Sequence, residues 1–162
     1  IGYEKVVINT AFVLNPSLVK EAAQFAGSQS IVVSIDVKNE LFGKRVCYIK
    51  DGTTKVKQDP VTLAKQAEAL GAGEILLNSI TMDGMMKGYD LELVKEITDS
   101  VSIPVVACGG AKDIYDFKRV LQEGGAHAAA AGSLFVYYGS QKAVLITTPE
   151  EKELVKIGVY RY

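Results

Sequence analysis

Two glycine-containing stretches of this sequence have residue types and spacing that suit the binding of a phosphate group. Cys108-Gly109-Gly110-Ala111 ends one short apolar run, and Ala131-Gly132-Ser133 ends the next. Between them lies a segment with a helical pattern, Asp113 to Glu123. Glycines let backbone N–H groups approach a ligand closely, and Ser133 adds a hydroxyl donor. The loops after the last two strands of a β/α barrel bind phosphate in this way, so the pair predicts a phosphorylated small-molecule substrate.

Part of this pattern recurs near the start of the chain. At one constant offset, Thr10 takes the place of Ser133 and Phe12 that of Phe135. The two segments are therefore expected to be equivalent strand-end loops, each with a hydroxyl group. If Ser133 helps to bind one phosphate, Thr10 and its neighbour Asn9 are expected to help bind another. The repeat predicts a substrate with a phosphate at each end, and the alternative interpretation is two tight turns built from small residues.

Composition bounds the classes of protein that this chain can belong to. Its 162 residues, of which 48% are hydrophobic, suit a single domain over residues 1–162. The formal net charge of −1 argues against nucleic acid as a partner, and no apolar run is long enough to cross a membrane. Cys47 and Cys108 lack the spacing of a disulfide framework or a metal site, and His127 is the only histidine. We therefore expect a cytoplasmic protein without a metal or another cofactor.

Short apolar runs alternate with helical patterns along the chain, which predicts an α/β fold with a parallel sheet. Asn15-Pro16 and Asp59-Pro60 each offer a helix N-cap followed by proline, and Asp51-Gly52 offers the turn of a hairpin that starts at Arg45. The expected strands are Lys5–Asn9, Ile31–Val37, Glu74–Asn78, Val105–Cys108 and Ala128–Ala131. The expected later helices are Asp90–Asp99, Asp113–Glu123 and Pro149–Lys156.

A set of collinear motifs resembles one enzyme family over nearly the whole chain. The motifs are Val7-Ile8-Asn9-Thr10-Ala11, Asn15-Pro16-Ser17-Leu18, Gly71-Ala72-Gly73-Glu74, Asp83-Gly84, Gly88-Tyr89-Asp90 and Ala107-Cys108-Gly109-Gly110-Ala111. Together they are similar to the cyclase subunit of imidazole glycerol phosphate synthase, a (β/α)₈ barrel of histidine biosynthesis. The resemblance implies that this chain supplies about strands four to eight and that an N-terminal portion is missing, since a full barrel needs about 250 residues. It also implies a lyase that takes ammonia from a partner glutaminase and cyclises a bisphosphorylated ribonucleotide.

The resemblance assigns roles to individual residues. Asp36 corresponds to one of two catalytic aspartates, the other lying on a strand that this sequence does not contain, and Asp83 corresponds to a further acidic residue near a phosphate. Lys5 and Glu74, at the amino ends of their strands, correspond to charges that gate the entry of ammonia. One phosphate site corresponds to Gly84, Gly109, Gly110, Gly132 and Ser133, and the other to Asn9 and Thr10.

The sequence also departs from the family pattern. Thr81-Met82-Asp83-Gly84 replaces the usual Asp-Arg-Asp-Gly, and the C-terminus, with Lys142-Ala143-Val144-Leu145-Ile146, is short. Its C-terminus is more similar to cyclase relatives that deliver ammonia for amidating a surface-polysaccharide sugar. An alternative function is therefore ammonia delivery to such a sugar, and another is a non-catalytic scaffold that activates a glutaminase. A related isomerase of the same pathway fits the motifs less well.

Overall fold

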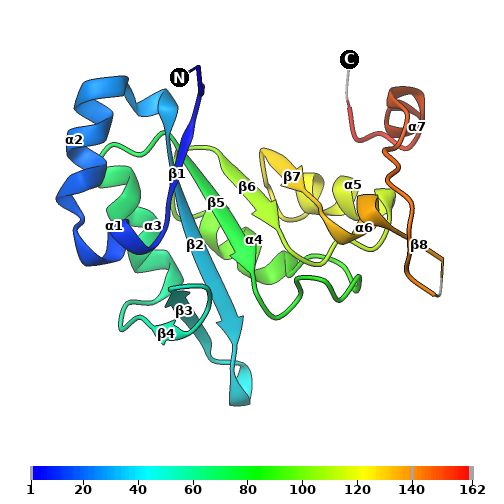
Figure 1. Cartoon of the computed structure of the whole chain (residues 1–162), viewed down its shortest axis with the longest axis horizontal. Helices are drawn as coiled ribbons and strands as arrows, with labels where there is room; N and C mark the ends of the chain where they lie inside the picture. The colour runs from blue at the N-terminus through cyan, green and yellow to red at the C-terminus, as the bar shows by residue number, and fades with distance from the viewer. Residues whose placement is uncertain (1, 140, 161–162) are drawn as a thin grey trace.

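The computed structural model describes residues 2–139 and 141–160, and its main element is a curved seven-stranded sheet (Figure 1). Five of its strands are parallel and follow the order β1-β2-β5-β6-β7. All five expected strands are confirmed, with ends that differ by one or two residues. Their bounds are β1 (Val6–Ile8), β2 (Ile31–Asn39), β5 (Glu74–Ser79), β6 (Val105–Cys108) and β7 (Ala128–Ala130). The parallel sheet with its helices is consistent with part of a (β/α)₈ barrel.

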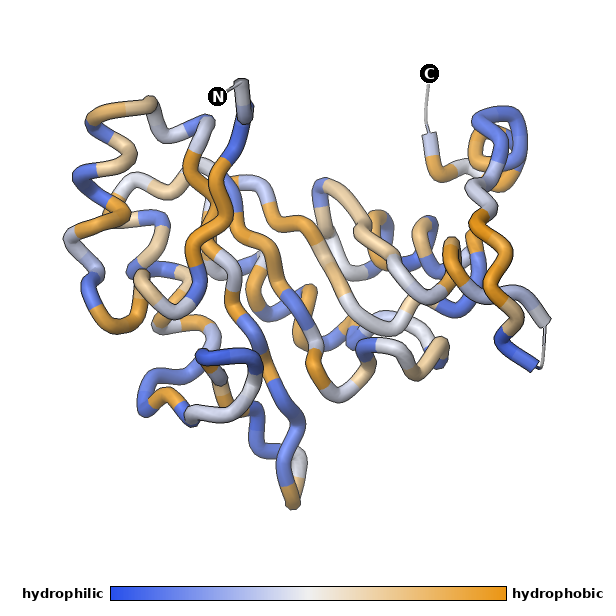
Figure 2. Tube along the Cα trace, viewed as in Figure 1, coloured by the Kyte–Doolittle hydropathy of each residue, from blue (hydrophilic) through white to orange (hydrophobic). Residues whose placement is uncertain are grey.

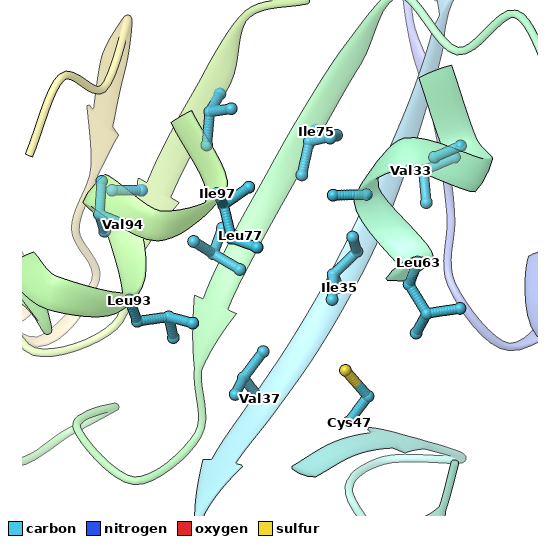
Figure 3. Close-up of a cluster of buried hydrophobic side chains, with 14 of the residues drawn as sticks. Val33, Ile35, Val37, Cys47, Leu63, Ile75, Leu77, Leu93, Val94 and Ile97 are labelled. Carbon is cyan, nitrogen blue, oxygen red and sulfur yellow. The ribbon is translucent and has the colours of Figure 1, made fainter. Parts of the chain in front are cut away.

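Helices follow the strands and cover one face of the sheet. On that face Ile35, Val37 and Leu77 pack against Leu63 of α3 and Ile97 of α4 (Figure 3). Figure 2 shows the hydrophobic residues concentrated along the central strands. The helices are α1 (Thr10–Leu14), α2 (Ser17–Ala26), α3 (Pro60–Ala69), α4 (Leu91–Thr98), α5 (Ile114–Gln122), α6 (Ser133–Val136) and α7 (Glu151–Lys156), with 3₁₀ turns η1 (Ser28–Ser30) and η2 (Leu41–Gly43).

The opposite face of the sheet, which we call the open face, is less buried and more polar. Along β2 the even-numbered positions Ser34 and Asp36 point away from the buried Ile35 and Val37, because successive side chains of a strand alternate. The same alternation places Asn78 of β5 on the open face. These strands are therefore not the evenly apolar elements expected of a sheet buried on both sides.

The expected hairpin forms, and it also lengthens the sheet. Strand β3 (Arg45–Ile49) pairs with β4 (Thr54–Lys55), and the turn includes Asp51 and Gly52. Strand β3 pairs in addition with the last residues of β2, from Asp36 to Asn39, in antiparallel register. The hairpin thus lies beside β1 along the same edge of β2, next to the carboxyl ends of the parallel strands.

The two segments expected to be strand-end loops are short helices instead. They are equivalent to each other, as expected. Residues from Thr10 and from Ser133 form the short helices α1 and α6 rather than loops. The residues that precede them, Asn9 and Gly132, have similar φ angles of −116° and −113°. Each accepts a 3.0 Å hydrogen bond from the backbone N–H of a phenylalanine three residues later. The two segments are therefore equivalent in backbone structure, as the internal repeat predicts.

The C-terminal segment contains elements that the sequence pattern did not indicate. A second sheet of two strands, β8 (Tyr137–Tyr138) and β9 (Ala143–Val144), precedes the expected last helix α7. No helix in the described part of the chain is long and apolar enough to span a membrane.

Candidate functional site

Three side chains form a row across the open face at the carboxyl ends of the central strands. Asp36 of β2 is in register with Asn78 of β5, and Asn78 is in register with Cys108 of β6. All three are partly buried. Because parallel strands end at one edge of the sheet, this row lies where the loops that carry the other candidate residues begin.

Asp36 occupies an environment that disfavours its negative charge. Burial raises the pKa of its carboxyl group, and the nearby Asp51 acts in the same direction. Hydrogen bonds to its Oδ1 from the Asn78 amide, at 3.4 Å, and from the Ser34 hydroxyl, at 3.2 Å, partly oppose this rise. A carboxyl group with a raised pKa holds a proton more readily than an ordinary aspartate does, which suits it to proton transfer.

The predicted glycine-rich phosphate site is brought together in one pocket, which we call the glycine pocket. Its walls come from the loops after β5, β6 and β7, and the space inside it is about 10 Å³, so it is a shallow concavity. The predicted residues that line it are Asp83, Gly84, Gly109, Gly110, Gly132 and Ser133. Ser133 can donate a hydrogen bond to an anion that lies against this concavity.

Gly110 is fixed in the glycine pocket by its backbone. Its φ angle of +110° is one that L side chains rarely adopt, and its carbonyl accepts a 2.8 Å hydrogen bond from the N–H of Gly88. A Cβ atom at this position would lie 2.2 Å from the Gly88 carbonyl oxygen. Glycine is therefore required here by both the conformation and the close approach of two loops.

The second predicted phosphate site, Asn9 and Thr10, lies at the other end of the row and its side chains already have partners. The Thr10 hydroxyl accepts from the Lys50 N–H at 3.0 Å and donates to Asn9 Oδ1 at 3.2 Å. Asn9 Nδ2 donates to the Ser34 carbonyl at 3.1 Å. A phosphate at Thr10 would thus compete with the β3–β4 turn for the same hydroxyl group.

The two predicted gate residues lie at the opposite ends of the strands from the row, and they contact each other. Lys5 Nζ is 2.6 Å from Glu74 Oε2, across the amino ends of β1 and β5. The Lys5 side chain is half exposed, and that of Glu74 is mostly buried. The structure therefore places these two charges together, and it places them away from the row and the glycine pocket.

Comparison with known proteins decides the family. The profile of a family described as "Histidine biosynthesis protein" matches residues 1–142. This chain belongs to that histidine biosynthesis protein family. Among its relatives are proteins named imidazole glycerol phosphate synthase subunit HisF: one from Petrotoga mobilis is 43% identical over 160 residues, and one from Saccharolobus solfataricus is 48% identical over 134 residues. These alignments cover 98% and 83% of this chain, and 61% and 53% of the relatives.

A relative from Vibrio vulnificus, with the provisional name imidazole glycerol phosphate synthase subunit hisF3, is 44% identical over 157 residues. The alignment covers 96% of this chain and 60% of that relative. The present chain thus spans about 60% of the length of the curated relatives it matches.

Two residues of the site were not predicted from the sequence. Ser34 and Asn78 contribute the hydrogen bonds to Asp36. Ser34 lies two positions before Asp36 on one strand, so the two-residue period of a strand would have placed it on the same face. Asn78 is a neighbour of Asp36 only through the pairing of β2 with β5, which no local pattern encodes.

Cys108 completes the row as a neutral group. Burial is the main cause that raises the pKa of its thiol, and Asp83 and Asp36 raise it further. A thiol that is protonated at neutral pH is a poor nucleophile. The environment therefore favours Cys108 as a small packing residue rather than a nucleophile.

Proposed function

We propose that this chain is part of the cyclase subunit of imidazole glycerol phosphate synthase and contributes strands four to eight of its barrel. The substrate would be the bisphosphorylated ribulosyl-formimino aminoimidazole carboxamide ribonucleotide, and ammonia would come from a glutaminase partner. The family membership and the names of the relatives support this assignment. The cytoplasm, where histidine would be made, is the compartment that we expect.

The observation that carries the proposal is the position of Asp36. It lies in the row between Thr10, at the end of β1, and the glycine pocket, beyond β5. Among the described residues no hydrogen bond reaches its Oδ2, so this oxygen is available for a ligand. A substrate with a phosphate at each end would lie across the row with its central part beside this oxygen.

In this arrangement each group has a distinct task. Asp36 would accept or donate a proton at Oδ2 as ammonia adds to the substrate and the ring closes. The glycine pocket would bind one phosphate through backbone N–H groups and Ser133, and Asn9 with Thr10 would bind the other once the Lys50 contact opens. Lys5 and Glu74 would gate the entry of ammonia at the amino end of the strands.

One departure favours a second candidate function, the delivery of ammonia to a polysaccharide sugar. Thr81 and Met82 stand where the family usually has an aspartate and an arginine, just before the residues of the glycine pocket. The Thr81 hydroxyl accepts from the Asn39 N–H at 2.8 Å, so this change is integrated into the end of β2. Such a change would suit a different ammonia-accepting substrate at the carboxyl ends of the strands.

The test is an activity assay with ammonium salt and the bisphosphate precursor, using the complete protein. Turnover that Asp36→Asn reduces by at least about 100-fold supports the cyclase, since a general acid or base contributes 10²-fold or more. Asp51→Asn is the matched control, because Asp51 acts on Asp36 only through its charge. Absence of turnover in the wild type, together with stimulation of a co-expressed glutaminase, would contradict the cyclase and support the sugar-amidating or scaffold functions.

A further inference from the structure

Asn78 lies between Asp36 and the loop of the glycine pocket, in the centre of the candidate site. It lies in the middle of the row, with Asp36 on one side and Cys108 on the other. Its amide donates to Asp36 Oδ1 at 3.4 Å. A Cβ atom built on Gly109 would lie 3.2 Å from Asn78 Oδ1, so the amide also contacts the loop that lines the glycine pocket.

The two ends of the Asn78 amide differ in how they are satisfied. Nδ2 donates to Asp36 Oδ1. Oδ1 is buried, and among the described residues no donor reaches it. A buried acceptor without a partner destabilises a fold by about 1–3 kcal/mol, and such groups are rare in native proteins. An apolar side chain of similar size, such as leucine, would avoid this penalty.

The same Asn78 side chain that leaves Oδ1 without a donor makes a hydrogen bond to Asp36. Asn78 and Ser34 both donate to the same oxygen, Oδ1, and both favour the ionised carboxylate. Two donors at one oxygen restrict the rotation of the carboxyl group, and among the described residues no hydrogen bond reaches Oδ2. The other titratable groups that act on Asp36 or share its surroundings are Asp51 on the β3–β4 turn and the thiols of Cys108 and Cys47.

We propose that Asn78 is a positioning residue for Asp36, which orients its carboxyl group and favours its ionised form at the expense of stability. The inference rests on the proposed function only in taking Asp36 as the proton-transfer group. It predicts that Asn78 variants change the titration of Asp36, which a residue with a purely structural role would not do.

The experiment measures the titration of the Asp36 carboxyl carbon by NMR in this chain, together with unfolding in urea. In Asn78→Leu the midpoint of the Asp36 titration is expected to move to higher pH, while resistance to urea is equal to or greater than that of the wild type. Ser34→Ala is the matched control for a lost donor and is expected to move the midpoint in the same direction. Asn78→Thr, which can supply a hydroxyl donor, is expected to bring it back toward the wild-type value.

The inference is overturned if Asn78→Leu leaves the Asp36 midpoint unchanged while Ser34→Ala moves it. If Asn78→Leu does not fold, the same comparison is made with Asn78→Ala, which removes the amide donor without adding bulk, and an unchanged midpoint there has the same meaning. Turnover measured in parallel keeps the two proposals apart. If Asn78→Leu shifts the midpoint although the wild-type protein does not convert the precursor, the result supports the role of Asn78 and contradicts the cyclase.

Discussion

At the scale of single residues, the site contrasts one partly buried acid with one exposed acid. Asp36 is enclosed by β2, β5 and the β3–β4 turn, whereas Asp83 is exposed at the rim of the glycine pocket. An exposed carboxylate beside a proposed phosphate site would repel the anion, so Asp83 is better placed to orient a neighbouring donor than to bind phosphate. Its catalytic role stays a prediction.

The raised pKa of Asp36 has a consequence for stability. Because the folded pKa lies above the ordinary value of 3.8, the native state binds more protons than the unfolded state between these two values. Stability therefore falls as pH rises through this window, and the loss persists at neutral pH. Removing the charge should relieve this loss.

We expect Asp36→Asn to be more stable than the wild type at pH 7, by up to about 1 kcal/mol, because a strained active-site group trades stability for activity. The gain should shrink as pH falls from the raised pKa of Asp36 toward 3.8, and it should be lost below 3.8, where both proteins are uncharged at this position. Urea unfolding at both pH values measures this difference. Asp99→Asn, which changes an exposed surface carboxylate, is the control and should show no gain. Equal destabilisation of both variants would contradict the prediction.

At the scale of elements, the loops of the glycine pocket differ in how strictly they need glycine. Gly110 has a positive φ and no space for a Cβ atom, because the Gly88 carbonyl lies against it. Gly132 has a φ of −113°, and nothing lies within 4 Å of the position that a Cβ atom would occupy. The two glycines line the same pocket, so they form a matched pair.

Gly110→Ala is expected to destabilise the protein by about 1–3 kcal/mol, since the substitution forces a strained backbone or a shift of the Gly88 loop. Gly132→Ala is expected to change stability by less than about 0.5 kcal/mol, as at other unstrained surface sites. Thermal unfolding of both variants measures the difference. A Gly132 variant that is stable yet binds inorganic phosphate more weakly would assign that glycine to the ligand. Equal losses of stability would show that the loop geometry is not the cause.

At the scale of the whole molecule, the parallel part of the sheet has two open edges. Among the described strands, β1 pairs only with β2 and β7 pairs only with β6. Strand β1 also exposes about half of the Val6 and Val7 side chains. Unpaired strands with exposed apolar side chains favour pairing with another chain or segment. The relatives, which are longer than this chain, have further residues that could pair there.

We therefore expect the 162-residue chain on its own to self-associate as its concentration rises, which sedimentation velocity can measure. Val7→Lys should weaken association, because a charge on an edge strand opposes strand pairing. Val144→Lys is the control, since it changes an exposed valine in the separate β8–β9 sheet. A chain that stays monomeric at every concentration, or equal effects of both variants, would contradict the role of the β1 edge.

Much of the fold is predictable from the sequence because its signals are local. The Asp59-Pro60 pair starts α3 as expected, with the Asp59 carboxylate accepting from the Thr62 N–H at 2.9 Å. The same reasoning was wrong by one position at Asn15-Pro16, where Pro16 occupies the N-cap of α2 and no side chain caps the helix. A helix start depends on contacts three residues apart, and a buried strand on its own apolar run, so both can be found without knowing the rest of the chain.

The sequence by itself also determined the glycine pocket, since glycines after successive parallel strands must meet at one edge. Only the tertiary structure decided the contacts of the site. Asn78 reaches Asp36 because β5 pairs with β2 in one register, and a shift by one residue would turn Asn78 to the opposite face. Likewise, the Lys50 N–H reaches Thr10 because the hairpin packs beside β1, across 40 positions of sequence. Pairing over such separations is set by the packing of the whole sheet, and no local pattern encodes it.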